Sequence, residues 1–185
     1  MHCESTLLNF ISGMKKILLI LLTFSLCLLS CKKEKEIPVS GIVTIDNTTQ
    51  LSQTYYVYGF LFSRAEIVST LDNPPPDITV ESDGTNLFFQ TNTFKNSFYK
   101  SGEYDNADAA KEAFDSLTTV NVTQWVGLAY PVEPDQIWIY RTGDEHYAKL
   151  RIISTVSEVR GDHDYAECTF EWVYQPDGSL TFPGK

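Results

Sequence analysis

Few residues of this chain have the types and spacing that catalysis or metal binding requires. Histidine occurs as His2, His146 and His163, and the densest group of potential metal ligands is Asp162-His163-Asp164. Because that group lies between two strand-like segments, we interpret it as a solvated hairpin turn, with a metal site as the alternative. The sequence contains no HExxH, CxxC, G-x-S-x-G, P-loop or G-x-G-x-x-G motif.

Acidic side chains are numerous, but no spacing among them singles out a carboxylate pair for glycoside hydrolysis. Histidine-based acid–base chemistry would have to use His146 or His163, since His2 precedes the export segment described next. The sequence therefore predicts a binding or structural protein and not an enzyme. A hydrolase with an unrecognised carboxylate pair is the third alternative.

The N-terminal segment has the order of charge, apolar run and cysteine that directs export. Lys15 and Lys16 precede a nearly unbroken apolar run of 13 residues, 17–29, and Ser30-Cys31 follows that run. This is the length of a signal-peptide core and is too short for a bilayer-spanning helix, which needs about 20 residues. The sequence Leu28-Leu29-Ser30-Cys31 resembles the lipobox of bacterial lipoproteins.

That resemblance implies a diacylglyceryl group on the Cys31 sulfur and cleavage that makes Cys31 the new N-terminus. We expect residues 1–30 to be a signal peptide, with Met14 as the true start, and the acyl chains on Cys31 to make the membrane a partner. Each buried CH₂ contributes about 0.8 kcal/mol, so two or more chains give stable anchoring. The alternatives are an anchor helix with an incidental Cys31, and secretion with a free Cys31. The expected location is the outer membrane of a Gram-negative cell envelope, on its periplasmic or outer face.

The chain from Cys31 onward has the length and charge of one acidic domain. It is 155 residues long, and removing Lys15, Lys16 and Glu4 from the full counts leaves 12 basic and 23 acidic side chains, a net charge near −11. Such a surface repels nucleic acid, so we exclude that partner. Cys168 is the one further cysteine, which excludes an intramolecular disulfide. We expect it to be a buried structural thiol.

Residues 31–39 form a short charged tether in our interpretation, and residues 40–185 form a single β-rich domain. Its fold class is mainly β, an antiparallel sandwich or barrel, with one short helix near 106–117 that lies against a sheet. The helix has Asp105 or Asn106 as its N-cap and a narrow apolar stripe. The strand-like segments are 40–45, 53–62, 67–68, 78–80, 87–91, 136–141, 146–159 and 165–174.

The last two segments predict a long hairpin with one apolar and one charged face. Ala148, Leu150, Ile152 and Val156 should face the core, together with Cys168, Phe170 and Trp172 of the partner strand. Lys149, Arg151, Thr155 and Ser157 should face solvent, with the two basic side chains opposite Glu167 and Glu171.

Aromatic residues are frequent for a chain of this length, at 13% of all residues. We interpret most of them as core residues of a β domain, because aromatic rings pack well on pleated surfaces. The alternative is that some of them line a groove for a flat ligand or a glycan.

Two regions resemble the HmuY-like family of haem-binding lipoproteins. The first comprises Tyr58-Gly59-Phe60-Leu61-Phe62-Ser63 and Pro76-Asp77-Ile78-Thr79-Val80. The second comprises residues 146–152 and the hairpin partner 169–178. This resemblance implies an all-β exported lipoprotein that captures haem between two axial ligands, and His146 and His163 are the candidate ligands. The alternative is that both are ordinary surface histidines.

We therefore predict a monomeric, envelope-anchored lipoprotein that acts as a ligand-binding module, with haem as its candidate ligand and cofactor. The alternative is a structural or adhesive surface domain that meets a host or glycan ligand and has no small-molecule site.

Overall fold

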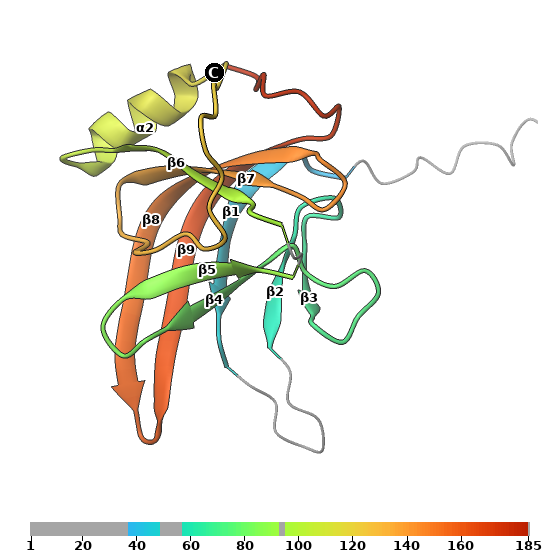
Figure 1. Ribbon diagram of the computed structural model, residues 1–185. Helices are drawn as coiled ribbons and strands as arrows, with labels where there is room; N and C mark the ends of the chain where they lie inside the picture. The colour runs from blue at the N-terminus through green and yellow to red at the C-terminus, as the bar shows by residue number, and fades with distance from the viewer. Residues whose placement is uncertain (1–36, 49–56, 93–94, 185) are drawn as a thin grey trace, which may run out of the picture. The chain divides into compact units, whose positions relative to one another are not determined.

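A computed structural model describes residues 37–48, 57–92 and 95–184 of the chain. Within those ranges, nine strands form two antiparallel sheets, one of five strands in the order β1-β9-β8-β7-β6 and one of four in the order β3-β2-β4-β5 (Figure 1). The first sheet contains β1 (Ser40–Asp46), β6 (Phe98–Glu103), β7 (Gln136–Arg141), β8 (Tyr147–Arg160) and β9 (His163–Gln175). The second contains β2 (Tyr58–Leu61), β3 (Glu66–Ser69), β4 (Ile78–Ser82) and β5 (Leu87–Thr91). The predicted mainly β, sandwich-like fold is confirmed.

Aromatic side chains fill the space between the sheets, as the sequence predicted. Phe60 of β2 and Phe62, which follows that strand, contact Trp172 of β9, with ring centroids 5.1 and 6.0 Å from the Trp172 ring. Phe89 of β5 meets Phe170 in the same way at 5.7 Å. These rings are buried, and their mixed edge and tilted contacts bind one sheet to the other.

Gly59 in β2 permits the close approach of β4. A Cβ atom at this position would lie 2.2 Å from the Ile78 carbonyl oxygen, so no larger residue fits without moving the backbone. The part of the predicted strand that lies in residues 53–56 is outside the described residues.

The segment 126–132 joins the two sheets along one side. Val126 pairs with Phe98 at the start of β6, and Ala129 pairs with Phe89 in β5. Because β5 and β6 are edge strands, these bonds satisfy backbone groups that would otherwise face solvent, and they close this side of the sandwich.

A β-bulge in β8 makes part of the predicted hairpin pattern wrong. The register with β9 shifts between Ile152 and Ser154, so Thr155 lies opposite Cys168 and Val156 opposite Glu167. The extra residue reverses the alternation beyond it. Val156 therefore lies on the outer face. Ser157, which was expected to face solvent, instead faces the other sheet, where its hydroxyl forms a 2.7 Å hydrogen bond with the Ser82 hydroxyl.

Helix α2 (Ala107–Ser116) lies against the outer face of the five-stranded sheet (Figure 1). Asn106 is its N-cap, since its side chain accepts a 3.0 Å hydrogen bond from the Ala109 amide. Ala110 and Phe114 are buried beneath the helix, which confirms the predicted apolar stripe. This helix and the C-terminal segment enclose a second apolar cluster on the outer side of the sheet, which includes Phe182.

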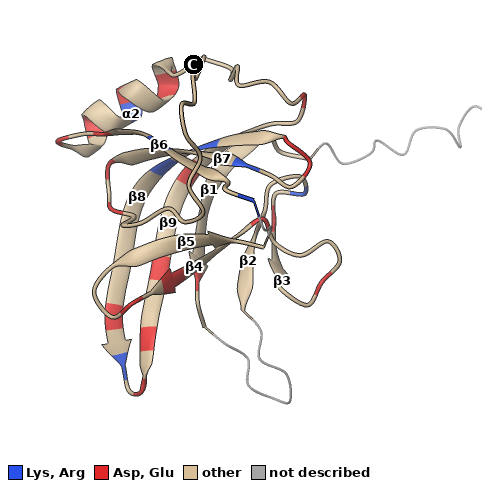
Figure 2. Cartoon of the chain, in the orientation of Figure 1, with Lys and Arg blue, Asp and Glu red and all other residues tan. Residues whose placement is uncertain are grey.

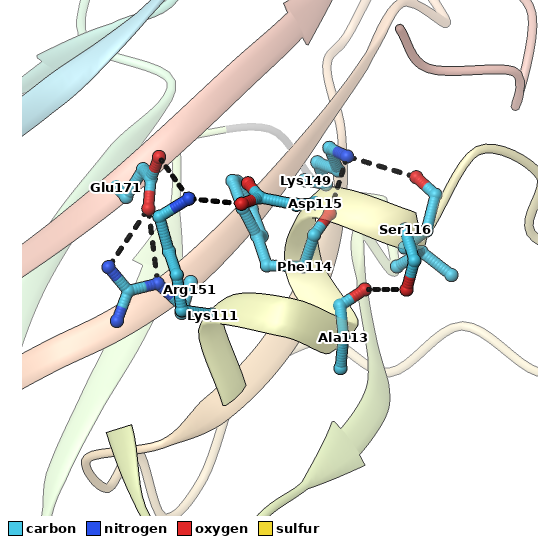
Figure 3. A network of polar contacts seen from close by, with 9 residues as sticks. Lys111, Ala113, Phe114, Asp115, Ser116, Lys149, Arg151 and Glu171 are labelled. Atoms are coloured by element: carbon cyan, nitrogen blue, oxygen red, sulfur yellow. Dashed lines mark hydrogen bonds and ion pairs between the residues drawn. The ribbon is translucent and has the colours of Figure 1, made fainter. Parts of the chain in front are cut away.

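The cover that α2 provides makes the second part of the hairpin prediction wrong, because the expected solvent face is buried. Lys149 is 1% exposed, and its Nζ donates to the carbonyls of Phe114 and Leu117 at 2.7 and 2.9 Å (Figure 3). A cation that bonds the last carbonyls of a helix satisfies them and complements the helix dipole. Lys149 therefore fixes the C-terminal end of α2 to the sheet.

Beside it, Arg151 and Glu171 form the cross-strand pair that the sequence predicted, but they are buried. The Nε and Nη2 atoms of Arg151 donate to Glu171 Oε2 at 3.1 and 2.9 Å. Lys111 of α2 lies 3.9 Å from the other Glu171 oxygen and also pairs with Asp115 (Figure 3). Lys111 and Asp115 thus contribute to the contact between helix and sheet.

Helix α2 is ten residues long, and no helix among the described residues has the length and apolar character to cross a membrane.

Candidate functional site

A cleft of about 460 Å³ lies at one end of the sandwich, and both sheets contribute residues to its lining. The four-stranded sheet contributes the end of β2 and the residues before β4 and after β5, and the five-stranded sheet contributes the β7–β8 turn and the end of β9. Two other hollows, beside α2 and beside the β4–β5 turn, have no histidine or aromatic residue in their lining. The apolar lining residues of the cleft are Leu61, Pro74, Pro75, Pro76, Tyr174 and Pro176, and the polar ones are Ser63, Asp77, Asn92, Thr142, Asp144 and His146.

Asp77 is fixed at the base of the cleft by bonds to both sheets. Its amide donates to the Phe60 carbonyl, and its side-chain Oδ2 accepts from the Phe62 amide, both at 2.9 Å. From the other sheet, the Tyr140 hydroxyl donates to the Asp77 carbonyl at 2.9 Å. Burial raises the pKa of the Asp77 carboxyl from 3.8 to about 6, against the opposing effect of the Phe62 amide and with a further increase from the Asp144 charge.

His146 enters the cleft from the tight turn between β7 and β8. The turn is closed by the Thr142 amide, which donates to the His146 carbonyl at 2.9 Å, and by the His146 amide, which donates to Thr142 Oγ1 at 3.1 Å. The imidazole Nδ1 lies 2.9 Å from the Tyr174 hydroxyl. Within the described residues, the second ring nitrogen, Nε2, makes no hydrogen bond, so it is available to a ligand.

The Tyr174 hydroxyl stays protonated at neutral pH. Burial raises its pKa to about 12, and the negative charges of Asp77 and Asp144 add to this effect. A neutral hydroxyl can donate to His146 Nδ1 or accept from it, so the contact is compatible with either imidazole tautomer.

His163 lies at the opposite end of the domain. It begins β9 and pairs with Arg160 across the hairpin turn, whereas Tyr147, next to His146, pairs with Gln175 at the other end of the same ladder. Thirteen residues of strand separate these ends, a distance on the order of 40 Å. His146 and His163 therefore cannot contact one haem iron together.

The Asp162-His163-Asp164 group is exposed, as expected of a hairpin turn, although β9 already begins at His163. In the part of the chain that the structure describes, no three His, Cys, Asp or Glu side chains are placed to hold a metal ion. Figure 2 shows acidic residues along this hairpin and in the turns, with fewer basic residues.

The structure describes Cys168 but not Cys31. Cys31, the predicted lipidation site, lies outside the described residues. Cys168 is fully buried, as predicted, and burial raises the pKa of its thiol above the ordinary value.

No protein-family model matches this chain, and no relative is found among curated proteins. The site is therefore assigned from the chemistry of its own residues.

Sequence reasoning identified His146 as a site residue but named neither Asp77 and Asp144 nor the prolines at 74–76 and 176 as site residues. One indication was present. All four segments that carry the resemblance to the HmuY-like family contribute to the cleft, through Leu61 and Ser63, Pro76 and Asp77, His146, and Tyr174 and Pro176.

Proposed function

We propose that this chain is a lipid-anchored ligand-binding module of a bacterial outer membrane, and that the His146 cleft is its binding site. The observation that carries the proposal is an apolar wall and converging polar groups at one end of a rigid sandwich. A volume of about 460 Å³ lies within the range of small-ligand sites, which is roughly 300–1,000 Å³. Rigid strands on both sides fix the positions of Asp77, Tyr174 and His146 before a ligand arrives.

The anchor is the acylated Cys31 of the lipobox-like segment. A Cys31→Ala variant, expressed in a Gram-negative host, should no longer incorporate labelled palmitate. Cys27→Ala is the matched control, because Cys27 lies in the apolar run four residues earlier. Labelling that persists without Cys31 would exclude this part of the proposal.

Haem is the second, more specific candidate for the ligand, and the observation that favours it is His146. Its Nε2 could serve as an axial ligand, with Tyr174 orienting the ring through Nδ1 as outer partners do in metal sites. The position of His163 limits such a complex to one histidine from this chain.

The cleft itself is tested by filling it. Ser63 is exposed and lines the cleft, so a Ser63→Trp side chain would occupy the ligand space without entering the core. Ser154→Trp, on an exposed position of β8, is the matched control. We expect apolar fragments that bind the purified protein in saturation-transfer NMR to lose binding in Ser63→Trp and to keep it in Ser154→Trp. Equal binding in both variants would place the site elsewhere.

An absorbance titration with haemin tests the more specific candidate. If haem is the ligand, the Soret band sharpens with the wild type and with His163→Ala, and this change is lost with His146→Ala. No spectral change in the wild type would exclude haem and leave the cleft as a site for another ligand.

A further inference from the structure

The cleft contains two carboxylates and no lysine or arginine among its lining residues. Asp77 uses one oxygen to accept from the Phe62 amide, and its other oxygen, Oδ1, makes no hydrogen bond within residues 37–48, 57–92 and 95–184. Asp144 lines the cleft from the β7–β8 turn, is exposed, and forms no ion pair within the same ranges. The cleft therefore presents negative charge without a positive partner.

A basic side chain that bonds this turn, Lys95, is already engaged. Lys95 Nζ donates to the Gly143 carbonyl at 3.1 Å and lies 3.7 Å from Glu145. His146 uses Nδ1 for Tyr174 and offers at most one further donor through Nε2. Among the residues that the structure describes, these contacts leave both Asp77 and Asp144 without a lysine or arginine partner.

An unpaired carboxylate in a partly enclosed site is unfavourable, because burial removes the water that stabilises its charge. The raised pKa of Asp77 has this origin, with Asp144 contributing through like-charge repulsion. A cationic group between the two carboxylates would relieve both effects, whereas an anionic group would add a third negative charge to the same space.

The apolar lining residues of the cleft, which we call the proline wall, determine what the uncharged part of a ligand can be. Leu61, Pro176 and the run Pro74–Pro76 present apolar surface and no side-chain hydrogen-bonding group. The Pro76 carbonyl accepts a 2.7 Å hydrogen bond from Asn92 Nδ2. This wall suits an apolar body that packs by contact area.

We infer that the cleft binds an organic cation, an ammonium or amidinium group on an apolar body, with its charge between Asp77 and Asp144 and its body against the proline wall. This inference rests on the proposed function of the cleft and specifies its ligand class. It also separates that class from haem, whose propionates are anionic.

The test uses three probes of nearly equal size and different charge, namely benzylamine, benzyl alcohol and benzoate. Their affinities for the purified protein are compared by saturation-transfer NMR at pH 7.5. We expect benzylamine to bind about tenfold more tightly than benzyl alcohol, as a hydrogen bond to a charged group allows, and benzoate to bind most weakly. Asp144→Asn should weaken benzylamine about fivefold and leave benzyl alcohol unchanged.

Two controls separate the cleft from the general acidity of the chain. Asp162→Asn removes one carboxylate at the exposed tip of the β8–β9 hairpin and should change no affinity. Ser63→Trp should abolish binding of benzylamine. If all three probes bind equally and Ser63→Trp abolishes their binding, the cleft is a binding site but the preference for cations is overturned. If benzylamine binds no more tightly than benzoate, or binds Ser63→Trp as well as the wild type, the inference is also overturned. If no probe binds and haemin gives no spectral change, both the inference and the proposed function are overturned.

Discussion

Replacing Asp77 with Asn should make the protein more resistant to unfolding as the pH rises. In the native state the pKa of this carboxyl is about 6, compared with an ordinary value of 3.8, because burial disfavours its charged form. A folded-state pKa above the unfolded one means that the native state binds more protons between these values. The wild type therefore has its full stability below about pH 3.8 and loses this contribution as the pH rises through 6.

The difference between the two pKa values corresponds to about 3 kcal/mol of unfolding free energy. Roughly 2 kcal/mol of this develops between pH 4.5 and pH 8, the range in which urea unfolding can be measured. The amide oxygen of Asn can still accept from the Phe62 amide. Any penalty for burying the amide nitrogen does not depend on pH, so it cancels when the variant is compared with the wild type at two pH values.

The assay is urea unfolding of both proteins at half-unit steps from pH 4.5 to 8. Asp83→Asn is the matched control, because hydrogen bonds from the Asn86 and Thr85 amides lower the pKa of Asp83. Because Asp83 is ionised in both states above its ordinary pKa of 3.8, its variant should differ from the wild type by a nearly constant amount between pH 4.5 and 8. Parallel curves for Asp77→Asn and wild type would refute the assignment of a raised pKa to Asp77, and with it the claim that the cleft holds an uncompensated charge.

Two further predictions concern the buried layer beneath α2. Lys149→Met keeps the side-chain volume but leaves two helix carbonyls unpaired, and urea unfolding should show a loss of roughly 2–5 kcal/mol. Recovery of that loss by high salt would contradict the role of direct hydrogen bonds. Arg151→Met should cost about 3–5 kcal/mol, because Glu171 stays buried without its main partner. The double variant Arg151→Met/Glu171→Leu should regain most of this loss, and a purely additive double-mutant cycle would exclude a direct coupling between the two side chains.

The strands were largely predictable from the sequence because alternation is a local property. Strands β5 and β7 have the predicted bounds, 87–91 and 136–141, and the helix differs from the predicted 106–117 by one residue at each end. A bulge is different, since one extra residue leaves the local composition unchanged and reverses every side chain that follows. The face of Val156 could therefore not be read from the pattern around it.

The burial of the charged face of the β8–β9 hairpin by α2 could not be predicted for a related reason. Lys149 and Arg151 alternate with apolar residues, the pattern of a strand with one solvated face. What buries them is a helix some 35 residues earlier, and its narrow apolar stripe indicates that it packs on a sheet without indicating where. The opposite charges of Arg151 and Glu171 were correctly paired, because cross-strand register follows from the hairpin, but their burial depends on a contact outside that hairpin.

The cleft was the hardest feature to predict from the sequence, because its residues come from five separate segments of the chain. His146 was nominated by residue type alone, whereas Asp77 follows three prolines and Asp144 sits in a turn, positions at which an acidic residue is ordinarily solvated. Only the pairing of the sheets brings these two carboxylates into one space. No local pattern in the sequence indicates that, among the described residues, the cleft lining contains no lysine or arginine beside them.

The charges beneath α2 and the carboxylates of the cleft differ in whether they have partners of opposite charge. Beneath α2, Glu171 has Arg151 and Lys111 as partners, and Lys149 bonds two carbonyls, so each charge there stabilises the contact of helix and sheet. In the cleft, Asp77 has one amide for a partner and a like-charged neighbour, although the chain pairs its buried charges elsewhere. Asp77 lowers stability by its own burial, yet its side chain and backbone are fixed by bonds to the two sheets, which supports the cation-binding role proposed for the cleft.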